Sequence, residues 1–298
     1  MLNAKIKNHL HLHFLVLIAG FTAILGELIS IDAIPLVWFR MLFTVVLMFL
    51  YIKITKINIK ISSKSLAKLA IAGIVIALHW MAFFGSIKVS NISIALGMFS
   101  TGAFFASIIE PIVYKRKIIW YEIIIGLFVV FGVFIITQNE FEYIYGIFLG
   151  LISAFLSSLF AVLNGKFLEK HSATVISFYE FLSGVLFISI FIFFLEKPFS
   201  IEFFNLDFLD YGYLFVLASV CSAYAFIASV HVMKVISPYT VVLSYNLEPI
   251  YGILIAMYLF PEQEKMSTSF YYGAAIIIIM VILNVILKNL RFLKRKRS

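Results

Sequence analysis

The hydrophobic positions of this chain form long runs, and its polar residues gather in short segments between them. A helix that crosses the hydrocarbon core of a bilayer needs about 20 mostly apolar residues. The runs reach this length and lack the alternation that a transmembrane β-strand requires. The sequence therefore predicts an all-α integral membrane protein. Ten transmembrane helices are expected, at residues 12–30, 34–52, 66–87, 92–114, 118–137, 146–165, 174–195, 211–232, 238–259 and 269–288.

Composition supports a lipid environment. Of the 298 residues, 63% are hydrophobic and 13% are charged, whereas soluble domains are about half apolar and about one quarter charged. A soluble domain of this length cannot bury so much apolar surface, so the lipid bilayer is the expected partner. The formal net charge is +8, but the basic residues sit in short clusters between the apolar runs. This placement indicates topology determinants and no nucleic-acid partner.

The basic residues also test the number of spans. If the N-terminus is cytoplasmic, the opposite loops contain only Lys88, Lys197 and Lys265, and Arg40 lies inside a span. Every other Lys and Arg falls in the cytoplasmic set of loops or at the termini, as the positive-inside rule requires. We therefore expect a multi-pass protein of the plasma (inner) membrane with both termini cytoplasmic.

Ten spans divide into two sets of five, and an odd number of spans per set inverts the second set relative to the first. Three pairs of segments recur in the same order: Trp38-Phe39-Arg40 with Phe178-Tyr179-Glu180, Lys88-Val89 with Lys234-Val235, and Trp120-Tyr121 with Phe270-Tyr271. The sequence thus predicts two inverted five-helix repeats, at residues 1–140 and 141–298.

Ionisable residues inside spans are costly and usually face a cavity or a partner. Glu27 and Arg40 lie in the outer thirds of their spans, so they are candidates for an ion pair with each other. Alternatively, the planar fork of Arg40 binds a substrate carboxylate. Glu180 is a candidate to hold a substrate amine or to pair with Lys166 or Lys170.

Span 9 contains Glu248 directly before a proline, with Tyr245 and Asn246 one turn earlier. Proline frees a backbone carbonyl in a helix, and freed backbone beside a carboxylate is a common way to build a midplane site. The segment is a candidate to bind an amine or a proton; a packing kink is the alternative. His79 and Trp80 are further candidates, with simple packing of the histidine as the alternative.

Other chemistry lacks its motifs. The sequence has no Walker-type glycine-lysine run, no His, Cys and carboxylate cluster with metal-ligand spacing, and no nucleophile–base constellation. We therefore expect no enzyme activity, no cofactor and no metal. Cys221 is the single cysteine, and we interpret it as a structural thiol. Glu110 is expected to pair with Lys115 or Arg116.

With these features the sequence resembles the drug/metabolite transporter superfamily, in its EamA-type ten-span branch. The resemblance depends on the two five-span halves, on Arg40 early in span 2, and on Leu247-Glu248-Pro249 followed by Glu262. It implies a secondary transporter of small metabolites, often an exporter, that works by alternating access. It also implies a central cavity lined by spans 1, 3, 4, 6, 8 and 9, and spans 5 and 10 are expected at the periphery.

The predicted function is export of a small-molecule substrate such as an amino acid or a related compound, with a proton or ion as candidate coupling partner. An integral-membrane enzyme and a channel remain the alternatives. The sequence leaves monomer and homodimer equally open.

Overall fold

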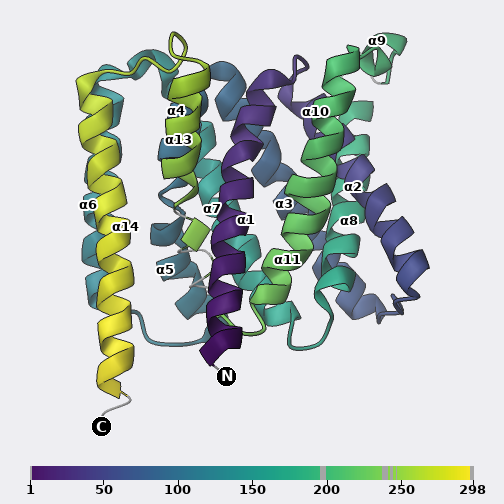
Figure 1. The fold of residues 1–298 in the computed structure, drawn as a ribbon, viewed down its shortest axis with the longest axis horizontal. Helices are drawn as coiled ribbons and strands as arrows, with labels where there is room; N and C mark the ends of the chain where they lie inside the picture. The colour runs from purple at the N-terminus through teal and green to yellow at the C-terminus, as the bar shows by residue number, and fades with distance from the viewer. Residues whose placement is uncertain (1, 195–198, 237–240, 242–243, 246, 296–298) are drawn as a thin grey trace.

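The computed structural model describes residues 2–194, 199–236, 241, 244, 245 and 247–295, and over these residues the chain is helical with no strand (Figure 1). The elements are α1 (Leu2–Leu28), α2 (Ala33–Thr55), α3 (Ser63–Val89), α4 (Ile92–Phe99), α5 (Gly102–Tyr114), α6 (Trp120–Asn139), η1 (Phe141–Tyr143), α7 (Ile144–Phe167), α8 (Ala173–Phe193), α9 (Ile201–Phe204), α10 (Phe208–Ala218), η2 (Ser219–Tyr224), α11 (Ala225–Val232), α13 (Glu248–Leu259) and α14 (Thr268–Arg295).

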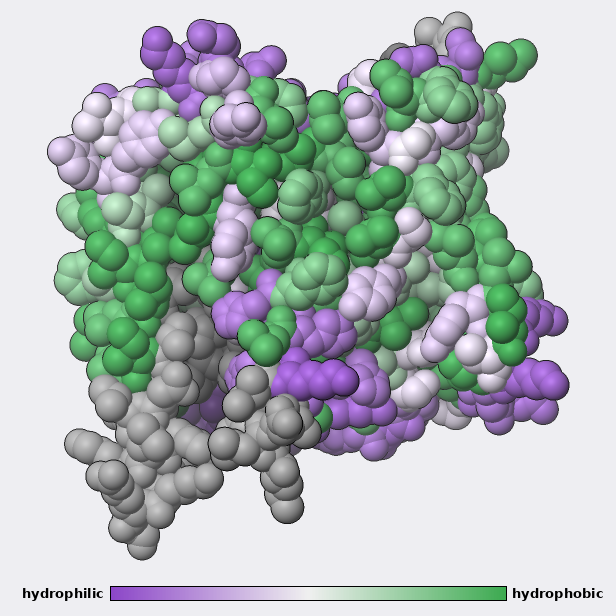
Figure 2. All heavy atoms as spheres, in the orientation of Figure 1, coloured by the Kyte–Doolittle hydropathy of each residue, from purple (hydrophilic) through white to green (hydrophobic). Residues whose placement is uncertain are grey.

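Among the described residues, 7 helical segments are long and apolar enough to cross a membrane, and three shorter apolar helices accompany them. The long segments coincide with seven of the expected spans, and the shorter helices fall where spans 5, 9 and 10 are expected. Figure 2 shows a hydrophobic band across the visible face, with hydrophilic residues gathered at its upper and lower edges. The chain is therefore a helical, multi-pass integral membrane protein.

Side-chain caps start several of these helices. The Oγ of Ser62 accepts a hydrogen bond from the backbone N–H of Ser65 at 3.2 Å, and the Oδ1 of Asn91 accepts one from Ile94 at 2.9 Å. A carboxylate from a distant loop adds a second cap to α4. Glu264 is buried and accepts the backbone N–H groups of Ile92 and Ser93 at 3.0 and 2.8 Å. A carboxylate is favourable there because the helix N-terminus carries a partial positive charge.

Three of the expected spans are not continuous α-helices, which corrects their prediction. Span 4 breaks at Ser100 and Thr101, whose hydroxyls donate to the carbonyls of Gly97 and Met98 at 2.6 and 2.7 Å. Such local bonds compete with the helical ladder. Span 8 contains the π-helical segment η2 between α10 and α11. In span 9, α13 begins at Glu248. Pro249 fits the first turn of a helix, because the N–H groups of that turn have no partner within the helix and proline lacks this group.

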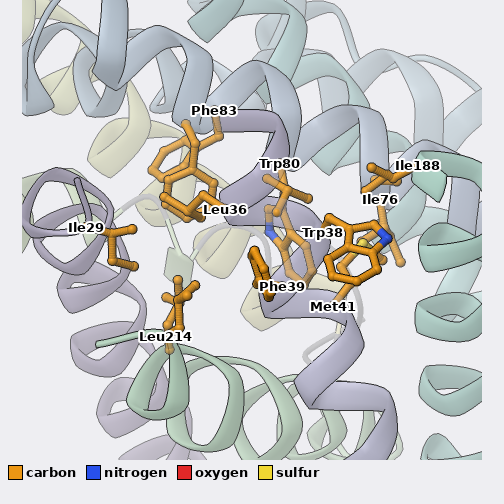
Figure 3. Close-up of a cluster of buried hydrophobic side chains, with 14 of the residues drawn as sticks. Ile29, Leu36, Trp38, Phe39, Met41, Ile76, Trp80, Phe83, Ile188 and Leu214 are labelled. Atoms are coloured by element: carbon orange, nitrogen blue, oxygen red, sulfur yellow. The ribbon is translucent and has the colours of Figure 1, made fainter. Parts of the chain in front are cut away.

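The largest hydrophobic cluster joins α1, α2, α3, α8 and α10 (Figure 3). Trp38 on α2 and Trp80 on α3 lie within it, and the indole of Trp38 donates a hydrogen bond to Ser189 on α8 at 2.9 Å. By contrast, α6 and α14 pack against each other at one edge of the bundle, at the left in Figure 1. Spans 5 and 10 are thus peripheral, as expected.

Helices α3 and α8 approach closely at two glycines. A Cβ atom on Gly73 would collide with the backbone carbonyl of Glu180, and one on Gly184 would lie 3.1 Å from the carbonyl oxygen of Gly73. Small residues allow such contact between transmembrane helices.

We expect Gly73→Ala to lower the free energy of unfolding by roughly 1–3 kcal/mol, because the new methyl group forces the two backbones apart. Gly212→Ala is the matched control, since a Cβ there meets no atom within 4 Å, and removal of a helical glycine stabilises by up to about 1 kcal/mol. Thermal unfolding of the detergent-purified proteins measures both. Equal melting temperatures for the two variants would contradict the close α3–α8 contact.

Candidate functional site

A cavity of about 140 Å³ lies inside the bundle. Helices α1, α2, α3, α7 and α11 contribute to its wall, together with residues at all three interrupted spans. Gly102 follows the break in span 4, Cys221 lies in η2, and Glu248 is the first residue of α13. Irregular backbone is tolerated at membrane depth where it lines a cavity. All three interruptions therefore share one location, and of these the sequence analysis predicted only the disturbance at Pro249.

Arg40 reaches the cavity from α2 and is only 2% exposed. Its Nε donates to the Oγ of Ser222 at 2.7 Å, and its guanidinium carbon lies 3.7 Å from the centre of the Trp80 ring. Such stacking positions a guanidinium on an aromatic face. The Arg40 guanidinium is therefore held in place at the cavity wall, while its Nη1 has no hydrogen-bond partner among the described residues.

Glu248 lines the same cavity at the N-terminus of α13 and is 5% exposed. No hydrogen bond joins its carboxyl group to another described residue, while the charges of Glu248 and Arg40 act on each other. Tyr245 also lines the cavity, and its hydroxyl shares a hydrogen bond with the Oγ of Ser229 at 2.5 Å. Asn246, the remaining candidate of this segment, lies outside the described residues.

Aromatic rings form much of the remaining wall. Trp80 is joined there by Phe99, Phe160 and Phe226. The cavity therefore combines one cation and one carboxyl group with flat apolar surfaces. This combination suits a small charged molecule that also carries an apolar part.

Glu180 does not make the contacts expected from the sequence. Its Oε2 accepts a hydrogen bond from the Nδ2 of Asn164 at 3.3 Å. Lys166, one predicted partner, donates instead to the backbone carbonyl of Val113 at 3.0 Å, and Lys170 is exposed. Glu180 is fully buried behind the wall, whereas Asn164 lines the cavity itself. The prediction of a lysine partner is wrong, because the rotation of α8 turns the carboxyl group towards α7.

Glu27 lies apart from the cavity. It is half-buried near the end of α1, where the charge of Lys88 acts on it. The ammonium group of Lys88 also donates to the carbonyl of Ile29 at 2.5 Å. Because Arg40 binds Ser222 and stacks on Trp80, the expected ion pair between Glu27 and Arg40 is absent from the described structure.

His79 is buried directly behind the cavity wall. Its Nδ1 lies 2.9 Å from the Oγ and 3.0 Å from the backbone oxygen of Ser153, and its ring packs against Phe99 and Phe160. These contacts match the packing alternative.

Glu110 forms a salt bridge with Arg116 at 2.7 Å, as expected. Glu262 is exposed, and the carboxyl group of this loop that makes structural contacts is Glu264. No group of three His, Cys, Asp or Glu residues able to hold a metal occurs among the described residues.

Sequence reasoning missed several uncharged polar residues of the cavity: Thr22, Ser157, Ser158, Asn164 and Ser229. An available signal was the amide of Asn164 within an otherwise apolar run. The serines gave no such signal, because serine is common at tight helix contacts as well as at binding sites.

Comparison with known protein families finds a match for the second half of the chain. Residues 144–286 match the EamA-like transporter family. A solved structure described as "Crystal structure of protein" superposes with a TM-score of 0.65 at 12% identity, over 93% of this chain and 96% of that chain. At this identity the likeness concerns the fold alone. None of the curated proteins matches the chain significantly.

Proposed function

We propose, on the premise that residues 144–286 form an EamA-like transporter domain, that this membrane protein exports small metabolites by alternating access. The observation that carries the proposal is the cavity of about 140 Å³ inside the bundle, with Arg40 and Glu248 on its largely apolar wall. Buried ionisable groups in a membrane protein usually mark a substrate or ion pathway.

The ten-span, inverted-repeat architecture is part of the proposal. Residues 1–140 and 141–298 would each supply five spans. Two observations support it: the start of α1 and the end of α14 lie on the same side of the bundle (Figure 1), and the proposed repeat mates, spans 4 and 9, are both interrupted. The distribution of basic residues among the loops supports cytoplasmic termini, and the plasma membrane is the proposed location.

The proposed substrate is a small zwitterion such as an amino acid or a related compound. Its acidic group would bind the free Nη1 of Arg40, since a guanidinium binds a carboxylate with charge-assisted hydrogen bonds. Its amine would face Glu248, with Tyr245 beside it. Arg40 belongs to the first half and Glu248 to the second, so such a substrate would bridge the two halves. Rocking of the halves would then open the cavity to each side in turn.

The test compares the exometabolomes of cells that overexpress the wild type, Glu248→Gln or Glu262→Gln. We expect one class of zwitterionic compounds to accumulate outside with the wild type and with Glu262→Gln, because Glu262 is exposed in a loop. Glu248→Gln should lose this accumulation, since the neutral amide no longer offers a charge to the amine. All variants must be present in the membrane at equal amounts.

Identical profiles for the wild type and Glu248→Gln would remove Glu248 from the site. If no compound accumulates with the wild type either, counterflow in proteoliposomes decides between import and the absence of transport.

A further inference from the structure

We propose that Glu180 and Asn164 form a proton-binding site beside the substrate cavity, in which Glu180 carries a proton in the described conformation. Glu180 is 0% exposed and Asn164 is 1% exposed. One hydrogen bond joins them, from the Nδ2 of Asn164 to the Oε2 of Glu180. The Oε1 of Glu180 and the Oδ1 of Asn164 have no hydrogen-bond partner among the described residues.

The Oε1 of Glu180 and the Oδ1 of Asn164 show that the pair lacks one hydrogen-bond donor. Three of the four polar atoms here are oxygens, and an ionised carboxylate and an amide oxygen both only accept hydrogen bonds. A single added proton on Oε1 turns the carboxylate into a donor, and its acceptor is then the Oδ1 of Asn164. The acid and the amide would then share two hydrogen bonds in a cyclic pair. One proton thus satisfies both buried atoms at once.

No neighbouring charge offers an alternative to the proton. Helix α8 packs against α2, α3 and α11, and Asn164 approaches from α7. On the sides of these helices near the pair, Arg40 binds Ser222, His79 binds Ser153, Lys166 binds the carbonyl of Val113, and His231 is exposed. Among the described residues, the hydrogen bond from Asn164 is the polar contact of the Glu180 carboxyl. The remaining cations of α2 and α3 are accounted for likewise: Lys53, Lys64 and Lys68 are exposed, and Lys88 binds the carbonyl of Ile29. An unpaired ionised carboxylate at full burial would be strongly unfavourable.

The position of Asn164 connects the proton to transport. Asn164 lines the cavity, whereas Glu180 lies behind it. Loss of the proton would leave two acceptor oxygens facing each other, and their repulsion would turn the Oδ1 of Asn164 towards the cavity while its Nδ2 keeps the bond to Glu180. Proton release would therefore change the polar lining that the substrate meets. This second step depends on the proposed transport function, while the proton site itself does not.

Infrared spectroscopy of the purified full-length protein at neutral pH tests the proton site without a substrate. Exposed carboxylates are ionised at this pH, so a protonated-carboxyl band reports buried groups. We expect such a band in the wild type and in the control Glu262→Gln, and a weaker band in Glu180→Gln; other buried carboxyl groups, such as Glu248 and Glu264, are the same in all three proteins and cancel in the difference. The glutamine keeps one donor and one acceptor towards Asn164, so this variant should fold. In Asn164→Ala the band should remain but move to higher frequency, because the hydrogen bond to the carbonyl is lost.

Identical bands in the wild type and Glu180→Gln would overturn the proposal, as would a band that Asn164→Ala leaves unshifted. The coupling step is tested in proteoliposomes with the zwitterion identified in the export experiment. Under a pH difference of one unit, exchange of one proton per substrate supports about a tenfold substrate gradient. Glu180→Gln should retain counterflow and lose this gradient.

The two proposals can fail separately. A protonated Glu180 in a protein that transports nothing would leave the proton site intact and remove the transport function. Transport by a protein in which Glu180→Gln leaves the protonated-carboxyl band unchanged would keep the transport function and remove the proton site.

Discussion

Replacing Arg40 by methionine is expected to abolish transport and to leave the protein as stable as the wild type, or more stable. Arg40 is 2% exposed, and no carboxylate forms a salt bridge with it among the described residues. Exchange of a buried charged group for a well-packed apolar one is often neutral or stabilising. Its main hydrogen-bond partner, the Oγ of Ser222, keeps its own bond to the carbonyl of Leu217 at 2.7 Å.

The loss of transport follows from the substrate's charge. Without Arg40, the acidic group of a zwitterion in the cavity would be buried and unpaired, a penalty of roughly 3–5 kcal/mol. This corresponds to an affinity more than about 100-fold weaker. Arg40→Lys is the matched variant, because lysine keeps the charge but loses the planar fork and the stacking on Trp80. Loss of one charge-assisted hydrogen bond of roughly 1.5–3 kcal/mol predicts a smaller decrease in affinity.

Counterflow rates in proteoliposomes and melting temperatures in detergent measure the two effects on the same preparations. A structural role for Arg40 predicts the opposite pattern, with a lower melting temperature in Arg40→Met and near-normal counterflow in the protein that remains folded. Full transport by Arg40→Met would remove Arg40 from the substrate site.

The positions of the membrane helices could be predicted from the sequence because apolar length alone determines them. A run such as residues 34–52 is apolar apart from Arg40 and Thr44, and α2 occupies it. One or two polar residues in a span suggest its inner side but do not determine how the helix is rotated against its neighbours. The rotation decides the partners of buried groups. Glu180 thus meets Asn164 and not Lys166, and Arg40 meets Ser222 and not Glu27.

The interrupted spans show a second reason for incomplete prediction. Pro249 carries a local signal for a helix start, and α13 begins next to it. The π-helical segment η2 has no comparable signal, and it lies against a distant residue: Arg40 donates to Ser222 and to the carbonyl of Cys221. Contacts between residues about 180 positions apart cannot be deduced from the pattern around Cys221 alone. The sequence analysis named Arg40, Trp80, Tyr245 and Glu248, which line the cavity, but it did not identify the uncharged Thr22, Ser158, Asn164 and Ser229 of the same wall.

Modification of Cys221 by a maleimide is expected to stop transport completely. Cys221 is the single cysteine of the chain and lines the cavity of about 140 Å³. A thioether adduct at this position would fill much of that volume and displace any substrate. The sequence suggested a structural thiol, whereas its place at the cavity makes it a reporter of access.

The matched control is Cys221→Ser, which keeps a small polar side chain and offers no thiol. It should transport normally and resist the reagent. The measurement is counterflow before and after treatment, with mass spectrometry to confirm the adduct. Inhibition of Cys221→Ser, or full counterflow by fully modified wild type, would contradict the cavity as the substrate path.

The same thiol distinguishes alternating access from a channel. A carrier exposes its cavity to one side at a time, so a membrane-impermeant maleimide should reach Cys221 from one side in a given state. Saturating substrate on the opposite side shifts the population of states and should therefore change the labelling rate. In a channel both sides would reach the thiol at once, and substrate would slow labelling equally from each side. Sided labelling that responds to the substrate gradient is thus the outcome that alternating access requires, and simultaneous labelling from both sides would exclude it.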